Sequence, residues 1–335
     1  MTSEFNIIQQ YFTRPTRHTQ LGVGDDAALI KPTLGMQIAV STDMLVAGTH
    51  FFYDAAPYCI GWKSLAVNVS DMAAMGAQSR WATLAIALPN FLADSSCETE
   101  DELHITPAWL TDFSSGFFDC ADAFNIDLIG GDTTRGPLNI SVTIMGKVPT
   151  GQALRRDSAK LDDDIWVSGK LGNASMALAI LENRHVNDNN WPENELQKWL
   201  SCLHLPQPRA ALGSALREIA TSCIDVSDGL LADLGHILAA SNLGAAITLE
   251  RLPMSLYNLN HLDEAIVQQC VLAGGDDYEL CFSAPKRARE KIIALGIELD
   301  LQITHIGSIC PNIGLQVMYK NTELKLTKQG FDHFG

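Results

Sequence analysis

The sequence predicts a mixed α/β (α+β) protein built from two domains. Its 335 residues, 47% hydrophobic and 19% charged, exceed the ~250–300 residues beyond which a single hydrophobic core rarely grows. Strand-like segments alternate with helix-like segments along most of the chain, and a polar stretch over residues 152–164 interrupts this alternation. We therefore place the boundary at Pro149-Thr150-Gly151 and expect one α/β domain over 1–150 and another over 151–335.

Strands of the first domain are predicted at residues 37–45, 80–89 and 139–149, where β-branched and other apolar residues recur in short runs. Helices are predicted at residues 60–76 and 107–124, where longer apolar-rich runs continue beyond the usual length of a strand.

The second domain is expected to repeat this mixture of elements. A helix is predicted at residues 175–184, followed by a polar surface loop over 185–195. The predicted strands lie at residues 165–172, 221–229, 245–253, 270–285, 303–309 and 315–320.

Charge and cysteine content exclude several classes of function. With 23 Lys and Arg against 39 Asp and Glu, the net charge is −16, opposite to the basic surface that nucleic-acid binding requires. The eight cysteines are scattered, without a CxxC pair or zinc-type spacing. No signal-peptide pattern and no run of 18 apolar residues is present. We expect a cytoplasmic protein with reduced thiols and neither a nucleic-acid nor a membrane partner.

Aspartates recur beside glycine or a hydroxyl residue at the ends of apolar runs. Any one such motif alone is an ordinary turn or helix cap. In α/β sheets, however, ligands bind beyond the carboxyl ends of strands, so that several of these aspartates could converge there. The six motifs are Gly24-Asp25-Asp26, Ser41-Thr42-Asp43, Ser70-Asp71, Gly130-Gly131-Asp132-Thr133-Thr134, Asp225-Val226-Ser227-Asp228 and Gly274-Gly275-Asp276-Asp277.

Converging carboxylates need a cation. Two of them ~4 Å apart repel by ~4 kcal/mol at an effective dielectric constant near 20. Aspartates and hydroxyls without a Cys/His cluster are hard oxygen donors that suit Mg²⁺ rather than zinc. Because Mg²⁺ is commonly shared between carboxylates and substrate phosphates, a nucleotide is the expected companion.

Asp71 is the most informative of these residues. Ser64, Asn68, Asp71 and Met75 follow i, i+4, i+7, i+11 spacing and share one face of a predicted helix that is otherwise apolar. A carboxylate that is mostly buried requires a partner.

Two familiar nucleotide motifs do not fit. Residues 22–27 match G-x-G-x-x-A, but no clear strand precedes them and Pro32 shortens any helix that follows. No G-x-x-x-x-G-K-[ST] motif is present, since Gly146-Lys147 and Gly169-Lys170 are followed by Val148 and Leu171. If the protein uses ATP, it does not use a P-loop.

Ordered motifs over most of the chain carry a family resemblance. The chain resembles the thiamine-monophosphate kinase family, of the superfamily that includes aminoimidazole ribonucleotide synthetase and selenophosphate synthetase. The motifs are GVGDDAAL, STDMLVAGTHF, WKSLAVNVSDMAAMGA, LIGGDTTRGP, IDVSDGLLADLGHI, GGDDYELCF and the terminal GFDHF.

The resemblance implies ATP-dependent phosphorylation of thiamine monophosphate to thiamine diphosphate, by direct in-line transfer with several Mg²⁺ ions. It also implies an N-terminal domain that forms a dimer barrel with its twin, hence a homodimer. By matching motifs, the metal ligands would be Asp26, Ser41, Thr42, Asp43, Asp71, Asp132, Asp225 and Asp228. ATP would contact Gly131, Asp132, Arg156 and Ser227, the thiamine phosphate would contact His50, Asp276 and Phe331, and catalysis would depend on Asp71, Asp132 and Arg156.

These roles are chemically reasonable. Metal ions and Arg156 can neutralise the triphosphate, and the anionic acceptor needs no strong general base. A cationic thiazolium ring suits an aromatic face and a carboxylate. Without the resemblance, His50 and Phe331 would be ordinary packing residues, and Arg156, like Arg155, an ordinary solvated arginine. The family commonly has Glu and Tyr where this chain has Asp276 and Phe331, which affects ligand contacts more than the reaction.

Two other functions remain alternatives. Another ATP-dependent synthetase of the superfamily would activate an amide or a selenide, but selenophosphate synthetases carry a reactive Cys in a glycine-rich N-terminal segment, and none lies before Cys59. A non-catalytic nucleotide-binding subunit should have lost metal positions, whereas all six mapped aspartates are present.

Overall fold

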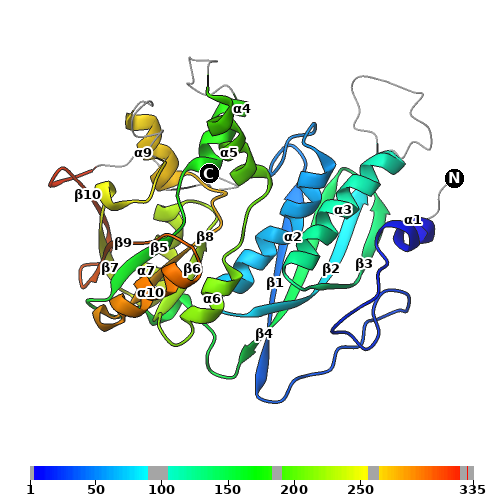
Figure 1. The fold of residues 1–335 in the computed structure, drawn as a ribbon, viewed down its shortest axis with the longest axis horizontal. Helices are drawn as coiled ribbons and strands as arrows, with labels where there is room; N and C mark the ends of the chain where they lie inside the picture. Colours follow the sequence, from blue (N-terminus) through cyan, green and yellow to red (C-terminus); the bar gives the residue numbers. More distant parts are fainter. Residues whose placement is uncertain (1–3, 90–104, 183–190, 256–263, 325–329, 331–335) are drawn as a thin grey trace. The chain divides into compact units, whose positions relative to one another are not determined.

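A computed structural model of the chain describes residues 4–89, 105–182, 191–255, 264–324 and Gly330. The predicted mixed α/β class is confirmed, because two sheets carry helices on their faces (Figure 1). The chain forms two compact units: unit 1 is Met1–Met72 with Gln78–Thr150, and unit 2 is Ala73–Ala77 with Gly151–Gly335. No single cut of the chain separates the two units.

The sheet of unit 1 has four strands in the order β1-β4-β2-β3. They are β1 (Met36–Val46), β2 (Gln78–Leu88), β3 (Asp127–Arg135) and β4 (Asn139–Pro149). β4 is antiparallel to both neighbours, while β2 and β3 are parallel. Strands β1, β2 and β4 confirm the predicted segments, whereas the acidic segment that forms β3 was predicted only as a turn.

Helices α2 (Pro57–Ala74) and α3 (Pro107–Ala123) lie on one face of this sheet (Figure 1). Two glycines let them pack closely. A Cβ on Gly61 would lie 2.0 Å from the carbonyl oxygen of Phe113, and one on Gly116 would lie 1.9 Å from that of Tyr58. Any side chain at either position would force the helices apart.

A buried aspartate fixes the N-terminal segment to unit 1. After α1 (Glu4–Tyr11), the carboxylate of Asp127 accepts hydrogen bonds from the main-chain N–H groups of Arg17 and His18 at 2.8 and 2.6 Å, and from the hydroxyl of Thr19 at 2.9 Å. Asp127 is the first residue of β3. The loop that follows residue 19 therefore starts from a fixed point beside this strand.

The sheet of unit 2 has seven strands in the order β11-β10-β7-β9-β5-β8-β6. Except for the parallel pair β7 and β10, neighbouring strands are antiparallel. The strands are β5 (Asp164–Ser168), β6 (Ser222–Val226), β7 (Gly244–Thr248), β8 (Glu279–Ala284), β9 (Ile303–Cys310), β10 (Gly314–Tyr319) and β11 (Thr322–Glu323).

Both faces of this sheet are covered, because the central strands divide their side chains between two cores. On β8, Cys281 joins a core formed with α7 and α9, whereas Leu280 and Phe282 join a core formed with α6 and α10. The α-helices are α4 (Asn173–Leu181), α5 (Glu193–His204), α6 (Ala210–Leu216), α7 (Leu230–Ser241), α9 (Glu264–Ala273) and α10 (Arg289–Glu298), with 3₁₀ turns η1 (Arg156–Ser158), η2 (Leu249–Arg251) and η3 (Lys286–Ala288). Within the described residues, no helix is long and apolar enough to cross a membrane.

Several predicted elements of unit 2 are wrong in part. The strands predicted at 165–172, 221–229 and 245–253 extend beyond β5, β6 and β7, and residues 249–251 form η2. Residues 270–273, predicted as the start of a strand, end α9, because Val267, Cys270 and Val271 form the buried face of a helix. Residues 193–195, predicted as loop, form the first turn of α5. The first six residues of that predicted loop lie outside the described ranges.

Among the described residues of unit 2, Asp164 is the most completely buried charge. Its carboxylate accepts hydrogen bonds from the guanidinium of Arg289 at 2.5 and 2.7 Å, and the Nε2 atom of His305 lies 3.3 Å away. Burial alone would raise the pKa of Asp164, but the Arg289 bonds and the nearby charge of His305 hold it below its usual value.

Replacing this carboxylate should destabilise the protein in a pH-dependent way. Asp164→Asn should lower the free energy of unfolding by about 3 kcal/mol at pH 7. A depressed folded-state pKa contributes stability above the unfolded value near ~4, and this contribution disappears as the pH falls through the folded-state pKa. Urea unfolding of both proteins at pH 7 and near pH ~3 should therefore show a smaller difference in acid. The control is Glu290→Gln on α10, which should leave the free energy of unfolding nearly unchanged. An equal loss of stability in Asp164→Asn at both pH values would contradict the assigned role of the carboxylate.

Candidate active site

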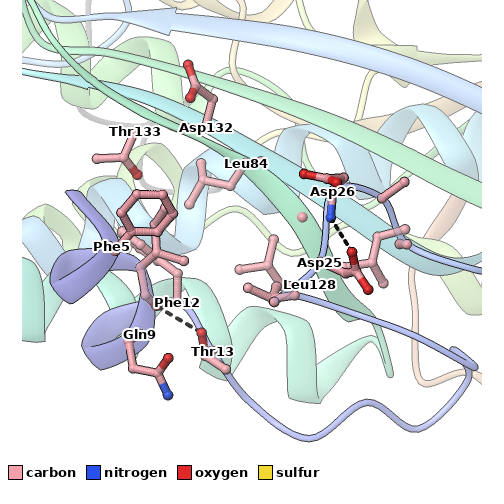
Figure 2. A pocket seen from close by; sticks show the side chains of 18 residues that line it. Phe5, Gln9, Phe12, Thr13, Asp25, Asp26, Leu84, Leu128, Asp132 and Thr133 are labelled. Carbon is pink, nitrogen blue, oxygen red and sulfur yellow. Dashed lines mark hydrogen bonds between the residues drawn. The ribbon is translucent and has the colours of Figure 1, made fainter.

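Unit 1 contains a cavity of about 620 Å³ between α1, the loop of residues 23–28, and strands β2 and β3. Figure 2 shows Phe5 of α1, and Phe12 just after this helix, across from the Asp25–Asp26 loop, with Leu84 and Leu128 of the sheet between them. The cavity thus combines an apolar wall with an acidic rim, an arrangement typical of sites for a ligand with a flat apolar ring and a charged group.

The aromatic wall comes from Phe5 of α1 and from Phe12, which directly follows this helix. Phe12 is buried and packs edge-on against Phe113, with ring centroids 6.3 Å apart. Phe5, near the start of α1, is 78% exposed and lines the cavity. An exposed aromatic side chain at the wall of a cavity offers a stacking surface for a planar ligand.

The acidic rim contains three of the predicted site residues, Asp26, Gly131 and Asp132. The main-chain N–H of Asp26 donates to Oδ1 of its neighbour Asp25 at 2.8 Å (Figure 2). Asp132 lies within β3, opposite Ala85 of β2. The structure therefore brings the first and fourth acidic motifs to the same cavity.

The backbone around position 131 leaves no room for a side chain. Its φ angle is +154°, and a Cβ would lie 1.8 Å from the carbonyl oxygen of Leu84 on the parallel strand β2. The segment predicted as an acidic turn is thus the middle of a strand. Ser41-Thr42-Asp43 likewise lies within a strand, β1, as the predicted strand at residues 37–45 requires.

Ser41 and Asp71 meet on the helix-covered face of the unit 1 sheet. The hydroxyl of Ser41 donates to Oδ2 of Asp71, which projects from α2 and is half-buried. Asp43, two residues along β1, belongs to the same face as Ser41. The hydroxyl of Thr42 instead contacts that of Thr143 at 2.8 Å on the opposite face, so it is not brought together with Asp71.

The polar residues on one face of α2, Ser64, Asn68 and Asp71, have two different roles. Ser64 and Asn68 are fully buried, and both donate to carbonyl groups of their own helix, those of Gly61 at 2.8 Å and Ser64 at 3.1 Å. Of these three side chains, only Asp71 forms a hydrogen bond to another element, the one with Ser41 of β1. The predicted face therefore exists, but its two buried residues serve the helix.

His50 lies in the loop after β1. The main-chain N–H of Val46 donates to Nδ1 of His50 at 3.0 Å, and the N–H of His50 donates to the carbonyl of Val46 at 2.9 Å. This contact assigns the proton of the neutral imidazole to Nε2. A protonated ring would lose the acceptor at Nδ1.

In unit 2, Asp225, Ser227 and Asp228 lie at and just after the end of β6. A further aspartate, Asp233, accepts hydrogen bonds at Oδ2 from the N–H groups of Ser227, Asp228 and Gly229 at 3.0, 3.1 and 3.1 Å. Burial raises the pKa of Asp233 to about 7, with repulsion from Asp225 and Asp228 adding to the effect.

The turn that carries Asp276 is bound to this same segment. The N–H of Asp276 donates to the carbonyl of Ser227, and that of Tyr278 donates to the carbonyl of Val226, both at 2.8 Å. Asp276 and Tyr278 have positive φ angles of +66° and +50°. The Tyr278 hydroxyl donates to Oδ1 of Asp276 at 3.1 Å, which orients the carboxylate. The predicted residues Ser227 and Asp276 therefore lie side by side.

Arg156 lies away from this pair of turns. The carbonyl of Arg155 accepts from Cys223 at the start of β6, and the carbonyl of Arg156 accepts from the hydroxyl of Ser241 at the end of α7. Because α7 has 12 residues, its two ends are about 18 Å apart. Ser227 precedes the beginning of this helix, so the structure does not bring the two predicted ATP ligands together within unit 2.

The available donors fit Mg²⁺. The cavity of unit 1 offers the carboxylates of Asp25, Asp26 and Asp132 and the hydroxyl of Thr133. In the part of the chain that the structure describes, no three His, Cys, Asp or Glu side chains lie close enough to enclose a metal ion. Mg²⁺ commonly takes one or two carboxylates, several waters and substrate phosphates. The donor set is therefore suited to an ion that binds together with a nucleotide.

Some of the candidate site residues were not predicted from the sequence, and one predicted residue lies outside the described part of the chain. Phe5 and Phe12 could have been found from the sequence, since the apolar residues at positions 5, 8 and 12 follow helical spacing. Asp233 had a weaker signal, as an acid within the IDVSDGLLADLGHI motif, shortly after Asp228. Phe331 lies outside the described residues.

Comparisons with known proteins agree over nearly the whole chain. Residues 24–148 match the N-terminal domain of AIR synthase related proteins. The chain is 42% identical over 337 residues to the thiamine-monophosphate kinase of Escherichia coli strain K12, covering 99% of this chain and 98% of that protein.

Two solved structures extend the comparison. The crystal structure of thiamine-monophosphate kinase from Stenotrophomonas maltophilia K279a is 46% identical, with a TM-score of 0.79 over 90% of this chain and 91% of that one. The structure of AaThiL complexed with AMPPCP and TMP is 27% identical, with a TM-score of 0.74 over 93% and 92%. With its two-sheet α/β fold and its acidic cavity, the chain belongs to the thiamine-monophosphate kinase family.

Proposed function

We propose that the protein transfers the γ-phosphoryl group of ATP to thiamine monophosphate, releasing thiamine diphosphate and ADP. The observation that carries the proposal is the cavity of unit 1, which places an aromatic wall opposite Asp26, Gly131 and Asp132. The family membership, and a relative whose structure holds AMPPCP and TMP, give the two substrates. Thiamine diphosphate synthesis in the cytoplasm is part of the same proposal.

ATP fits the cavity in one orientation. The adenine ring would lie against Phe5 and Phe12, because an uncharged ring gains most from the apolar wall. The triphosphate would lie toward Asp26 and Asp132, which requires cations between the negative groups. When bound, Mg²⁺ supplies that positive charge and withdraws electron density from the phosphorus.

The transfer itself requires little acid–base chemistry. An oxygen of the acceptor phosphate forms a bond to the γ-phosphorus, while the bond from that phosphorus to the β–γ bridging oxygen breaks and ADP leaves. The attacking oxygen is already anionic, so no group has to remove a proton. Asp71, Asp132 and Arg156 would act by positioning and electrostatic stabilisation.

The family motifs give the proposed contacts of the acceptor. His50 would offer Nε2–H to the phosphate of thiamine monophosphate, and Asp276 would lie near the cationic thiazolium ring, with Phe331 as its aromatic partner. The remaining proposed metal ligands are Asp26, Ser41, Thr42, Asp43, Asp225 and Asp228. For Thr42, the proposal requires the main-chain carbonyl, since the hydroxyl contacts Thr143.

We also propose a homodimer formed through the open face of the unit 1 sheet. On β1, Ile38, Val40 and Met44 share one face and are 41%, 61% and 55% exposed. In the described part of unit 1, β1 pairs with β4 alone, so it ends the sheet. A row of exposed apolar side chains on an edge strand is a surface that soluble proteins usually cover.

The kinase proposal is tested by incubating the purified protein with ATP, Mg²⁺ and thiamine monophosphate. Equal amounts of thiamine diphosphate and ADP should form, and EDTA or replacement of the substrate by thiamine should abolish the reaction. ADP without thiamine diphosphate would instead indicate another synthetase of the superfamily.

Asp71→Asn should reduce kcat/KM by about 100-fold or more, because it removes a charge from the proposed metal site. The melting temperature should change little, since the amide can still accept the Ser41 hydroxyl hydrogen bond. Asp112→Asn, an exposed acid on α3, is the matched control and should retain full activity. Near-normal turnover of Asp71→Asn would remove Asp71 from the metal site.

Val40→Lys should convert the dimer into a monomer, because it places a charge in the centre of the proposed apolar interface. Light scattering after size exclusion would measure the mass of each variant. Ile297→Lys is the control, since Ile297 is 78% exposed on α10 of unit 2 and should leave the dimer intact. A monomeric wild type, or a dimeric Val40→Lys variant, would contradict this interface.

A further inference from the structure

We propose that Asp233 is a positioning residue that fixes the turn of Ser227, Asp228 and Gly229 for the binding of magnesium-bound ATP. The inference rests on the proposed function, in which Asp228 is a Mg²⁺ ligand, and on the family motifs, which give Ser227 as an ATP contact. It adds a residue that would contact neither ligand and that acts through the shape of the turn.

The geometry around Asp233 is that of an anchor. Its side chain is 2% exposed, and one oxygen accepts three consecutive N–H groups, at 3.0 Å from Ser227 and at 3.1 Å from Asp228 and from Gly229. In return, the N–H of Asp233 donates to the carbonyl of Gly229 at 3.0 Å. Hydrogen bonds in both directions therefore close the turn onto the first turn of α7.

This arrangement determines which groups of the turn are available. The three N–H groups that could have formed an anion-binding nest are already taken by the Asp233 carboxylate. A ligand can therefore be bound through the side chains of Ser227 and Asp228 rather than through the main-chain amides. Asp233 decides where those two side chains project.

The path of the turn is restricted on its other side as well. Gly229 has a φ angle of +118°, and a Cβ there would lie 2.8 Å from the carbonyl carbon of Ala273. The carbonyl of Ser227 accepts the N–H of Asp276 at 2.8 Å. A shift of the turn would thus alter contacts on both of its faces, which makes a single well-defined position necessary.

A buried carboxylate at the other end of β6 supplies the matched control. Asp163 is 4% exposed, accepts the N–H of Lys160 at 3.0 Å, and accepts the hydroxyl of Thr221 at 2.5 Å. It resembles Asp233 in burial and in bonding to backbone, yet it lies near the start of the strand. Asp163→Asn should therefore report general weakening of unit 2 without movement of the Ser227 turn.

The first measurement is calorimetric binding of Mg²⁺ with AMPPCP to full-length protein and its variants. Asp233→Ala, which removes the acceptor of three N–H groups, should weaken binding by about tenfold or more. Asp233→Asn keeps an oxygen in the same place and should stay within about threefold of wild type, as should Asp163→Asn. In kinetic assays, Asp233→Ala should raise the KM for ATP more than the KM for thiamine monophosphate.

Three results would overturn the inference. They are unchanged binding by Asp233→Ala, an equal loss in Asp233→Asn, or an equal loss in Asp163→Asn. If Asp233→Ala does not fold, hydrogen exchange on the wild type decides: the amides of Ser227–Gly229 should be protected before any nucleotide is added, and rapid exchange there would refute an anchored turn. A wild type that fails to bind Mg²⁺ with AMPPCP would refute the proposed function, while the exchange measurement would still test the anchor.

Discussion

Burying a carboxylate is costly unless hydrogen-bond donors surround it, and several aspartates of this chain meet that requirement through backbone N–H groups of nearby loops. Asp127 accepts two such groups and a hydroxyl from the segment that leads to the Asp25–Asp26 loop. Asp233 accepts three from the turn after β6. Asp277 accepts the N–H of Gly172 before α4, and burial raises its pKa well above the usual value. The loops that carry candidate site residues take their shape from these contacts.

The acidic residues therefore divide into two populations that a sequence does not distinguish. Asp276 and Asp277 are adjacent, yet Asp277 accepts the N–H of Gly172 before α4, while Asp276 has a positive φ angle and accepts the Tyr278 hydroxyl. The pattern of aspartates beside glycines was enough to predict an oxygen-rich site. Which member of each pair faces a ligand depends on backbone angles, and these follow from packing of distant segments.

Much of the fold followed from periodicity, and the errors have a common cause. Strands such as β1 and β4 alternate clearly, so they were predicted within a residue or two. β3 was read as a turn because glycines and aspartates suggest turns in isolation, whereas pairing with β2 holds it extended. Residues 270–273 were assigned to a strand because a short apolar run has no period of its own. In each case, a neighbour distant in sequence settled the structure.

The close approach of Gly131 to the carbonyl of Leu84 limits which residues position 131 can accept. Because a Cβ would lie 1.8 Å from that oxygen, even alanine must push β3 away from β2. Such a displacement would carry Asp132 and the floor of the cavity with it. Packing of the sheet alone would therefore make position 131 intolerant of substitution. Such intolerance would not by itself be evidence that the residue contacts a nucleotide.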